Sequence, residues 1–265
     1  MSAWAANARN GSSIITTCSA TQKLPMRLRA TPVECSTLST HDIDRMFMLY
    51  AASYCDAQRD LFDRDLADKT HCVVLRDDDS IQGFSTLKLY TTTWRDKPLR
   101  VVFSGDTIID PQHWGSQQLA FTWIRLAGEF YRQSPDVPLY WFLICKGHRT
   151  YRYLRAFACD YAPRVDAETP ATTAALMDYL ARERFGAAYG ADSGVLSFER
   201  PQGRLAPELA EVSEAHRRLP DVAYFLARNP HYARGDELVC LCELAPANLR
   251  PMAQRLFGGV QTEQC

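Results

Sequence analysis

The amino-acid sequence predicts an α/β protein whose central sheet is mixed, mostly antiparallel and flanked by helices. Two runs that favour strands carry the prediction: residues 98–109 are rich in β-branched side chains, and residues 139–145 are wholly apolar. Between them, residues 116–132 repeat apolar side chains at helical spacing. A strand, helix and strand of these lengths place the two strands side by side and parallel, with the helix crossing over them.

The composition is that of an ordinary globular protein. The 265 residues are 46% hydrophobic and 23% charged, which suits one large domain or one domain with an appendage. A formal net charge of -1 excludes a generally basic nucleic-acid binder. Because no run approaches the ~18–20 apolar residues that span a bilayer, we expect neither a nucleic-acid partner nor a membrane span.

The nine cysteines, an odd number scattered singly, predict free thiols rather than a disulfide framework. The first residues also lack the charged region and apolar core of a signal peptide, so we expect a cytoplasmic protein. Cys240 and Cys242 form the only close pair, and a strand would place both side chains on one face. We interpret them as buried structural cysteines rather than zinc ligands and expect no metal.

The N-terminal part is predicted to contain a loose arm and the first elements of the sheet. Residues 26–38 can supply a first strand, and Ser39 caps a following helix, with Asp42 three residues later. Residues 71–76 and 81–91 then form a hairpin around an acidic turn. We interpret the aspartates of this turn as exposed carboxylates rather than calcium ligands.

The pattern weakens after the helix that follows residue 147. We expect a helix after Pro170, a strand near 194–199, a surface helix at 207–218, a strand at 237–244 and a last helix. The long segment before the last strand is interpreted as an insertion or lid. The chain is therefore divided into a disordered arm (1–24), a core (25–165), an insertion or lid region (166–235) and a strand and helix that complete the core (236–265).

This order of elements, and the turn after the long strand, resemble the GNAT superfamily of acyl-coenzyme A-dependent N-acyltransferases. The family pattern in that turn is Gln/Arg-x-x-Gly-x-Gly/Ala, and this sequence has Gln112, Gly115 and Gln117 at those places. The resemblance covers residues 26–162, with weaker support to 244. It implies that the fourth and fifth strands splay apart and that the pantetheine arm of the donor lies in the gap.

The resemblance also implies where the pyrophosphate of the donor binds. It would meet the turn and the N-terminus of the next helix, where unpaired backbone amides attract anions. The implied donor-binding residues are Gln112, Trp114, Gly115, Ser116 and Gln117. Gln117 departs from the family pattern, because its side chain stands where a glycine or alanine would let the backbone approach a phosphate.

Arginines on the helix after residue 147 offer a second contact for an anionic donor. Arg149, Arg152 and Arg155 recur along one side of that helix. Such a face can hold the 3′-phosphate of coenzyme A or dock an acidic acyl carrier protein, and it is equally well an ordinary solvated face. We name Arg149 and Arg152 as donor-binding candidates, with coenzyme A or a phosphopantetheine thioester as donor.

Five residues are candidates for the chemistry. Acylation of an amine needs a base for the amine and a proton for the leaving thiolate. In the family a tyrosine after the fifth strand often gives that proton, and Tyr151 and Tyr153 lie there. His113 and His148 lie on turns at the strand ends, and Asp106 is an acid late in an apolar strand. The alternatives are that the two tyrosines pack in the core, that the two histidines are loop residues without a role, and that Asp106 has a structural partner.

These features predict an acyltransferase that moves an acyl group from acyl-coenzyme A or acyl carrier protein to a small-molecule amine. The alternative is a non-catalytic binding or scaffold protein of the same fold. It is suggested by Gln117 and by the lack of a single unmistakable catalytic residue.

Overall fold

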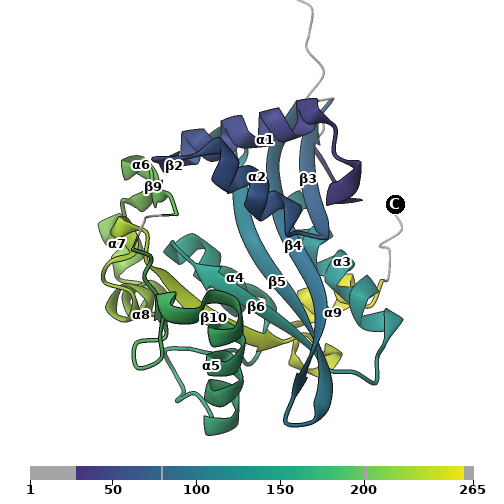
Figure 1. Cartoon of the computed structure of the whole chain (residues 1–265), viewed down its shortest axis with the longest axis vertical. Coiled ribbons are helices and arrows are strands. Elements are labelled where there is room, and N and C mark those ends of the chain that lie inside the picture. Colours follow the sequence, from purple (N-terminus) through teal and green to yellow (C-terminus); the bar gives the residue numbers. More distant parts are fainter. Residues whose placement is uncertain (1–27, 79, 200–201, 260–265) are drawn as a thin grey trace, which may run out of the picture.

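The structure is a computed structural model that describes residues 28–78, 80–199 and 202–259. The predicted arm at 1–24 lies outside the described residues. The chain folds into an eight-stranded sheet with helices on both faces, and a separate two-stranded pairing lies at one end (Figure 1).

The main sheet has the strand order β1-β3-β4-β5-β6-β10-β8-β7. Every neighbouring pair is antiparallel except β5 and β6, which are parallel, so the predicted mixed and mostly antiparallel sheet is confirmed. The strands are β1 (Arg29–Glu34), β3 (His71–Asp77), β4 (Ser80–Trp94), β5 (Lys97–Ile109), β6 (Leu139–Cys145), β7 (Tyr189–Gly190), β8 (Val195–Leu196) and β10 (Glu237–Glu243). The separate pair is β2 (Tyr54–Cys55) and β9 (Arg204–Leu205).

Helices cover the sheet in two layers. One face carries α3 (Gln118–Gln133), α4 (His148–Phe157), α8 (Pro220–Arg228) and α9 (Pro251–Phe257). The other carries α1 (Thr40–Ser53), α2 (Arg59–Ala67) and α5 (Ala171–Phe185). The short helices are α6 (Pro207–Ala210), α7 (Glu214–Arg217), η1 (Cys35–Thr37), η2 (Pro111–His113), η3 (Gly186–Ala188), η4 (Tyr232–Arg234) and η5 (Pro246–Asn248).

A local sequence signal fixes the start of the first helix. Ser39 and Asp42 form the predicted capping box, in which the Ser39 hydroxyl accepts from the Asp42 amide at 3.1 Å.

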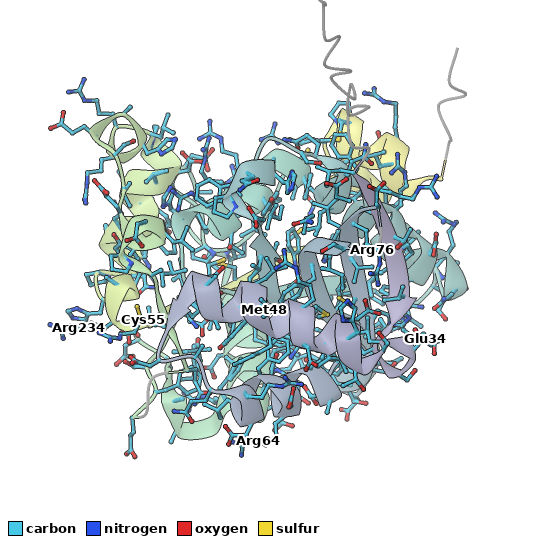
Figure 2. The ribbon with its side chains drawn as sticks, turned by 90° about the horizontal axis from the view of Figure 1, so that it is seen from above. Glu34, Met48, Cys55, Arg64, Arg76 and Arg234 are labelled. Atoms are coloured by element: carbon cyan, nitrogen blue, oxygen red, sulfur yellow. The ribbon has the colours of Figure 1, made fainter. Side chains whose placement is uncertain are left out.

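Seen from above, α1 lies across the sheet with Met48 on its outer side (Figure 2), where that residue is 62% exposed. Cys55 and Arg234 lie together at one end of the molecule, where β2 pairs with β9 and η4 packs beside it.

The parallel strands β5 and β6 splay apart as the resemblance implied (Figure 1). Their pairing runs from Arg100–Leu139 to Ser104–Leu143 and stops there. Beyond that point β5 follows β4 to Ile109, whereas the end of β6 pairs with β10.

A β-bulge causes the divergence. Ser85 of β4 lies opposite Thr107, but Leu87 lies opposite Ser104, so β5 has one extra residue in this interval. The extra length falls at Gly105 and Asp106, which bend the strand and re-aim the Asp106 side chain toward the face covered by α1, α2 and α5.

The C-terminal half differs in detail from the prediction. Residues 207–218 do not form one helix: α6 stops at Ala210, and Ser213 caps a new turn, α7, by accepting from the His216 amide. The strand expected near 194–199 is only the two residues of β8. Helix α8 was not anticipated; it begins at Pro220, whose fixed φ suits a first helical position.

The late strand and the last helix form as predicted, and β10 inserts between β6 and β8. Cys240 and Cys242 are buried in the same core cluster on one face of β10, and the described cysteines are free thiols. None of the helices within residues 28–78, 80–199 and 202–259 combines the length and hydrophobicity needed to cross a bilayer.

Candidate active site

Three hollows meet where β5 and β6 diverge. Thr107 of β5 and Thr150 of α4 line all of them. We call them the inner pocket (220 Å³), between the α1–α2 pair and α5; the aromatic recess (20 Å³), between α3 and α4; and the mouth (380 Å³), beside the β5–α3 turn and the β6–α4 turn.

The inner pocket is walled by ionisable side chains from six elements and from the β6–α4 turn. In the wall, Lys69 pairs with Asp65 at 2.5 Å, and Lys146 pairs with Glu237 at 3.5 Å. Asp106 instead receives a hydrogen bond from the Tyr54 hydroxyl at 3.3 Å. The pocket-lining ionisable residues are Tyr50, Tyr54, Asp65, Asp106, Lys146, Arg184 and Glu237.

Asp106 has the electrostatics of a base that works near neutral pH. Removal from water and, to a smaller extent, the nearby Asp65 charge raise the pKa of its carboxyl to about 6, against the opposing charges of Lys146 and Lys69. Within the described residues no cation lies within ion-pairing distance of this carboxylate. Its side chain is partly exposed, and that exposed part faces the inner pocket.

A short segment that begins at Gln202 covers the inner pocket. The Lys146 ammonium donates to the Gln202 carbonyl at 3.2 Å and lies 4.7 Å from the centre of the Tyr54 ring. Tyr50 donates to the same carbonyl at 3.4 Å. The segment that follows Gln202, including β9, is thereby fixed over the site.

The aromatic recess is narrow and mostly apolar, with hydroxyl groups as its polar side-chain atoms apart from the indoles. Trp123 and Trp141 pack with ring centres 4.5 Å apart and planes tilted by 40°, and the Trp141 indole donates to the Ser104 hydroxyl at 2.6 Å. Tyr153 lines the recess and stacks on Phe157. Burial raises the pKa of Tyr153, so its hydroxyl keeps its proton at neutral pH.

The mouth is crossed by one stacked pair. Trp114 donates its indole N–H to the Ile109 carbonyl at 2.9 Å, and the Arg149 guanidinium lies 5.0 Å from the centre of the Trp114 ring. Arg149 also donates to the Leu209 carbonyl at 2.8 Å. Leu205 reaches the mouth as well, close enough that a side chain at Gly147 would lie 3.2 Å from it.

The end of β5 presents backbone groups to this opening. The Asp110 amide donates to Gln82 on the β4 side at 2.8 Å. Because successive residues of a strand direct their backbone groups alternately to its two sides, those of Ile109 and Thr107 face the opened side. The bond from Trp114 to the Ile109 carbonyl agrees with this direction.

The other catalytic candidates lie elsewhere. Tyr151 is fully buried and donates to the Pro163 carbonyl at 2.9 Å. His148 is buried with its ring 5.6 Å from that of His216 on α7, and burial lowers its pKa to about 4. His113 lies on η2, and neither histidine lines the three hollows.

The turn that was expected to bind pyrophosphate bonds several of its own amides. The Gln112 amide donates to Asp110, and the Ser116 amide donates to the His113 carbonyl. Gln117 precedes α3 and has a helical backbone conformation. Its side chain is exposed and makes no capping hydrogen bond to the helix. Gly115 is also exposed, with nothing within 4 Å of a Cβ built on it.

The arginines of α4 divide into two groups. Arg152 donates to Asp221 of α8 at 3.1 Å, and Arg155 lies 3.8 Å from the same carboxylate, whose side chain is 4% exposed. Arg149 alone points into the mouth. The predicted arginine face is therefore in part an internal contact between α4 and α8.

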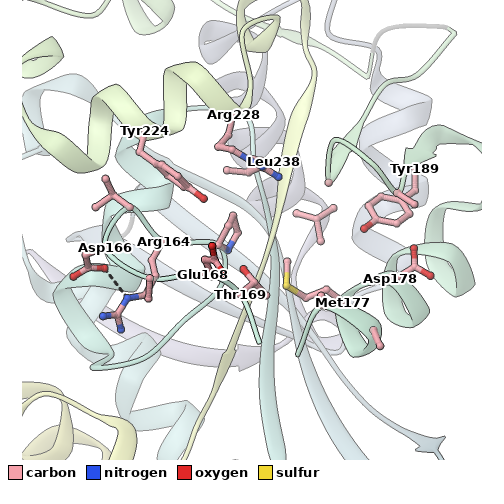
Figure 3. Close-up of a pocket in the computed structure, with 18 residues that line it drawn as sticks. Arg164, Asp166, Glu168, Thr169, Met177, Asp178, Tyr189, Tyr224, Arg228 and Leu238 are labelled. Atoms are coloured by element: carbon pink, nitrogen blue, oxygen red, sulfur yellow. Dashed lines mark hydrogen bonds and ion pairs between the residues drawn. The ribbon is translucent and has the colours of Figure 1, made fainter. Parts of the chain in front are cut away.

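A larger hollow lies on another side (Figure 3). It measures about 960 Å³ and opens between the loop at 163–169, α5, α8 and β10. Its Arg164 pairs with Asp166 at 2.6 Å, and its Asp178 pairs with Arg182 at 2.8 Å. We take the smaller inner pocket as the candidate site because it lies where β5 and β6 diverge.

Tyr54, Lys146, Thr150 and Glu237 border the junction but were not among the predicted residues. Lys146 follows the apolar strand β6, and Glu237 begins the apolar strand β10. The pairing of Cys145 with Leu238 brings both residues to the same edge of the sheet. A search for charged residues at strand ends could have found this pair. Tyr54 belongs to a two-residue strand and gives no such signal.

The strand order, the parallel pair that splays at a bulge and the helices on both faces define a GNAT-like α/β fold. No cluster of metal-binding side chains occurs among the residues that the structure describes. The site joins an acidic inner pocket and an apolar recess at one point.

Comparison with known proteins finds similarity in structure alone: no family model and no curated protein matches this chain. A "Probable N-Acyltransferase" from Enterococcus faecalis is 11% identical over 48% of this chain and 31% of its own, with a TM-score of 0.37. The GNAT family N-acetyltransferase YhbS from Escherichia coli, in complex with CoA, is 18% identical over 49% and 69%, with a TM-score of 0.36. An acyl-CoA N-acyltransferase from Pseudomonas aeruginosa is 18% identical over 49% and 88%, with a TM-score of 0.38.

Proposed function

We propose that this protein is an N-acyltransferase that moves a short acyl group from a coenzyme A thioester to a small amine. The observation that carries the proposal is the position of Asp106. It is a carboxylate at the bulge of β5, without a cation of its own in the described structure, beside the point where the hollows meet. Such a group suits an ammonium ion and can take its proton.

In the proposed reaction the amine occupies the inner pocket next to Asp106. The carboxylate accepts one proton from the ammonium, and the lone pair of the neutral nitrogen then attacks the carbonyl carbon of the thioester at the Thr107–Thr150 junction. The new C–N bond forms as the C–S bond breaks, and the nitrogen releases its second surplus proton to solvent. A pKa of about 6 leaves most Asp106 carboxylates ionised at neutral pH, as this role requires.

Two groups beside the junction assist the transfer. The Thr107 amide faces the opened side of β5 and can donate to the carbonyl oxygen as negative charge develops on it. The Tyr153 hydroxyl lines the recess and can give its proton to the leaving thiolate. Tyr153 thus serves as the acid in this proposal, and Tyr151, bonded to Pro163, does not.

The mouth suits the pantetheine arm of the donor. It leads to the junction between Trp114 and Arg149, and Arg149 can contact a phosphate. For the arm to bond along β5, the Trp114 indole has to leave the Ile109 carbonyl. Gln112, Gly115, Ser116 and Gln117 remain the proposed contacts of the pyrophosphate, through the amides that the turn does not use itself.

The aromatic recess suits the acyl group. It begins at the junction, and its apolar walls favour a hydrocarbon over the charged inner pocket. Its volume of about 20 Å³ is room for one group the size of a water molecule. The methyl of an acetyl group therefore fits, with its carbonyl at the junction, and longer chains require the Trp123–Trp141 pair to move. The free thiols are consistent with work in a reducing compartment such as the cytoplasm.

The test is release of free thiol from a panel of donors with a mixture of small amines as acceptors. We expect acetyl-coenzyme A to be turned over, hexanoyl-coenzyme A to be turned over at least tenfold more slowly, and Asp106→Asn to lower the rate at least a hundredfold. Faster turnover of acetyl-carrier protein would transfer the donor role to that protein. Tight donor binding without any thiol release would favour the scaffold interpretation.

A matched pair of variants tests the acid. Tyr153→Phe and Tyr151→Phe remove the same atom at positions two residues apart on α4. Tyr153→Phe is expected to lower kcat at least tenfold, whereas Tyr151→Phe costs about 1 kcal/mol of folding stability and leaves kcat unchanged. Equal kcat values for the two variants would remove Tyr153 from the mechanism.

A further inference from the structure

The wall of the inner pocket holds a set of charges with one carboxylate left over. The two lysines have one carboxylate each: Lys69 has Asp65 at 2.5 Å, and Lys146 has Glu237 at 3.5 Å. Arg184 of α5 bonds to Asp68, which lies just after α2 and also pairs with Lys88. Asp106 has only the Tyr54 hydroxyl, at 3.3 Å. A ligand that completes the set supplies one positive charge and no negative charge.

The rest of the wall is aromatic. Two of the rings already carry cations on their faces, since the Arg184 guanidinium lies 3.9 Å from the centre of Phe103 and the Lys146 ammonium lies 4.7 Å from that of Tyr54. Rings of this kind hold an apolar body and tolerate a cationic end. The aromatic lining consists of Tyr50, Tyr54, Phe62, Phe103, Phe185 and Phe198.

From these two observations we infer that the acceptor is a small primary amine with an apolar, aromatic or alkyl body and no carboxylate. This inference rests on the proposed function and specifies its second substrate. The ammonium group pairs with Asp106, and the body lies among the rings. The pocket volume of 220 Å³ is below the ~300–1,000 Å³ of sites for drug-sized ligands, so the acceptor is small.

An amino acid is a poor fit for the same reasons. Its carboxylate would enter a wall that already holds Asp65, Asp106 and Glu237, and every cation there is engaged. An anion that is desolvated without a new partner loses several kcal/mol in a protein interior. The wall therefore discriminates between an amine and the amino acid that differs from it only by a carboxylate.

The test uses the pair phenethylamine and L-phenylalanine with the full chain at pH 7.5. With acetyl-coenzyme A as donor, we expect kcat/KM for phenethylamine to exceed that for phenylalanine at least tenfold. Calorimetric titration without donor should give the same order of affinities, lost in Asp106→Asn. Equal or better use of phenylalanine, or no measurable binding of either compound, would overturn the inference.

A variant outside the pocket sharpens the test. Asp68→Asn removes the carboxylate that Arg184 shares with Lys88; Lys88 does not line the inner pocket, and the pocket lining stays intact. The preference for phenethylamine should then shrink roughly tenfold, because phenylalanine gains a partner for its carboxylate. Asp178→Asn is the control: it frees Arg182, an exposed residue of the same helix that does not line the inner pocket, and should leave the preference unchanged.

The two failures are distinguishable. Asp106-dependent binding of phenethylamine over phenylalanine, without thiol release from any donor, would sustain the inference about the ligand and refute the transferase. Rapid acetylation of phenylalanine would sustain the transferase and refute the inference. An unchanged preference in Asp68→Asn would also count against the charge argument.

Discussion

The Asp106 carboxylate is removed from water and, among the described residues, has a tyrosine hydroxyl but no cation as its partner. Its pKa is about 6 in the folded protein, against 3.8 for an ordinary aspartate. Between these pH values the unfolded chain releases its proton while the folded chain keeps it. The folded state therefore binds more protons there, and its stability falls as the pH rises from about 4 to about 6.

Replacing this carboxylate should stabilise the fold while stopping the reaction. For Asp106→Asn we expect a gain of roughly 1–3 kcal/mol in unfolding free energy at pH 8, since the charge no longer has to be desolvated. At pH 4 the gain should nearly vanish. Urea denaturation at the two pH values measures both; a variant less stable than the wild type at pH 8 would contradict the assignment.

His148 acts in the opposite direction. Burial and the charge of Arg149 lower its pKa to about 4, so the folded protein keeps it neutral where the unfolded chain protonates it. Its contribution to stability is fully present above about pH 6.5 and is lost as the pH falls through about 4.

The expected result of His148→Phe is a weaker loss of stability on acidification. The variant also removes a buried ring nitrogen, Nε2, that has no partner in the described structure, so stability at pH 7 should be equal or about 1 kcal/mol higher. His113→Phe, on the exposed turn, is the control and should follow the wild-type acid profile. Thermal unfolding between pH 4 and pH 7 provides the comparison.

At the scale of elements, α4 does two separate jobs with similar side chains. Arg149 serves the mouth, whereas Arg152 holds α8 through the buried Asp221. Arg149→Ala should raise the KM of a coenzyme A donor about tenfold, less at high salt, with little effect on stability.

Arg152→Ala should show the reverse. It leaves Asp221 with only the longer contact to Arg155, so we expect a loss of about 1–3 kcal/mol in stability and an unchanged donor KM. Steady-state kinetics and denaturation of both variants separate the roles. A carrier-protein donor would be indicated if both substitutions weakened donor binding equally and neither affected stability.

Elements with strong local signals could be predicted from the sequence, and short ones could not. Composition and hydrophobic period identify strands β5 and β6 and helices α3 and α4 in the sequence. The parallel pairing of β5 with β6 was predictable for this reason. The roof at β9 and α6 has two-residue and four-residue elements that leave no period. The same holds in the site: Asp106 was visible as an acid in an apolar strand, but its neighbours Tyr54 and Glu237 arrive through long-range pairing.

Across the whole molecule, the first crossover helix and the last helix are locked together at one glycine. A Cβ added to Gly128 of α3 would lie 2.0 Å from the Phe257 carbonyl oxygen of α9. Gly128→Ala should therefore cost ~1–3 kcal/mol, because this clash outweighs the ~0.5–1 kcal/mol that alanine usually gains in a helix.

Gly115→Ala is the matched control, since nothing lies within 4 Å of its Cβ position. Its stability should stay within about 0.5 kcal/mol of the wild type. Chemical denaturation of both variants tests the contact between α3 and α9. A Gly128→Ala protein as stable as the control would show that the two helices can move apart freely.

The position of β10 has a consequence for biosynthesis. This strand lies between β6 and β8, and its first residue, Glu237, supplies the partner of Lys146 in the pocket wall. While the ribosome has made only the residues before 237, the sheet lacks an interior strand, and the edge of β6 stays open. The nascent chain can therefore pair strands β1 and β3 to β6 before β10 is made, but the wall of the inner pocket closes only after residue 237 has been added.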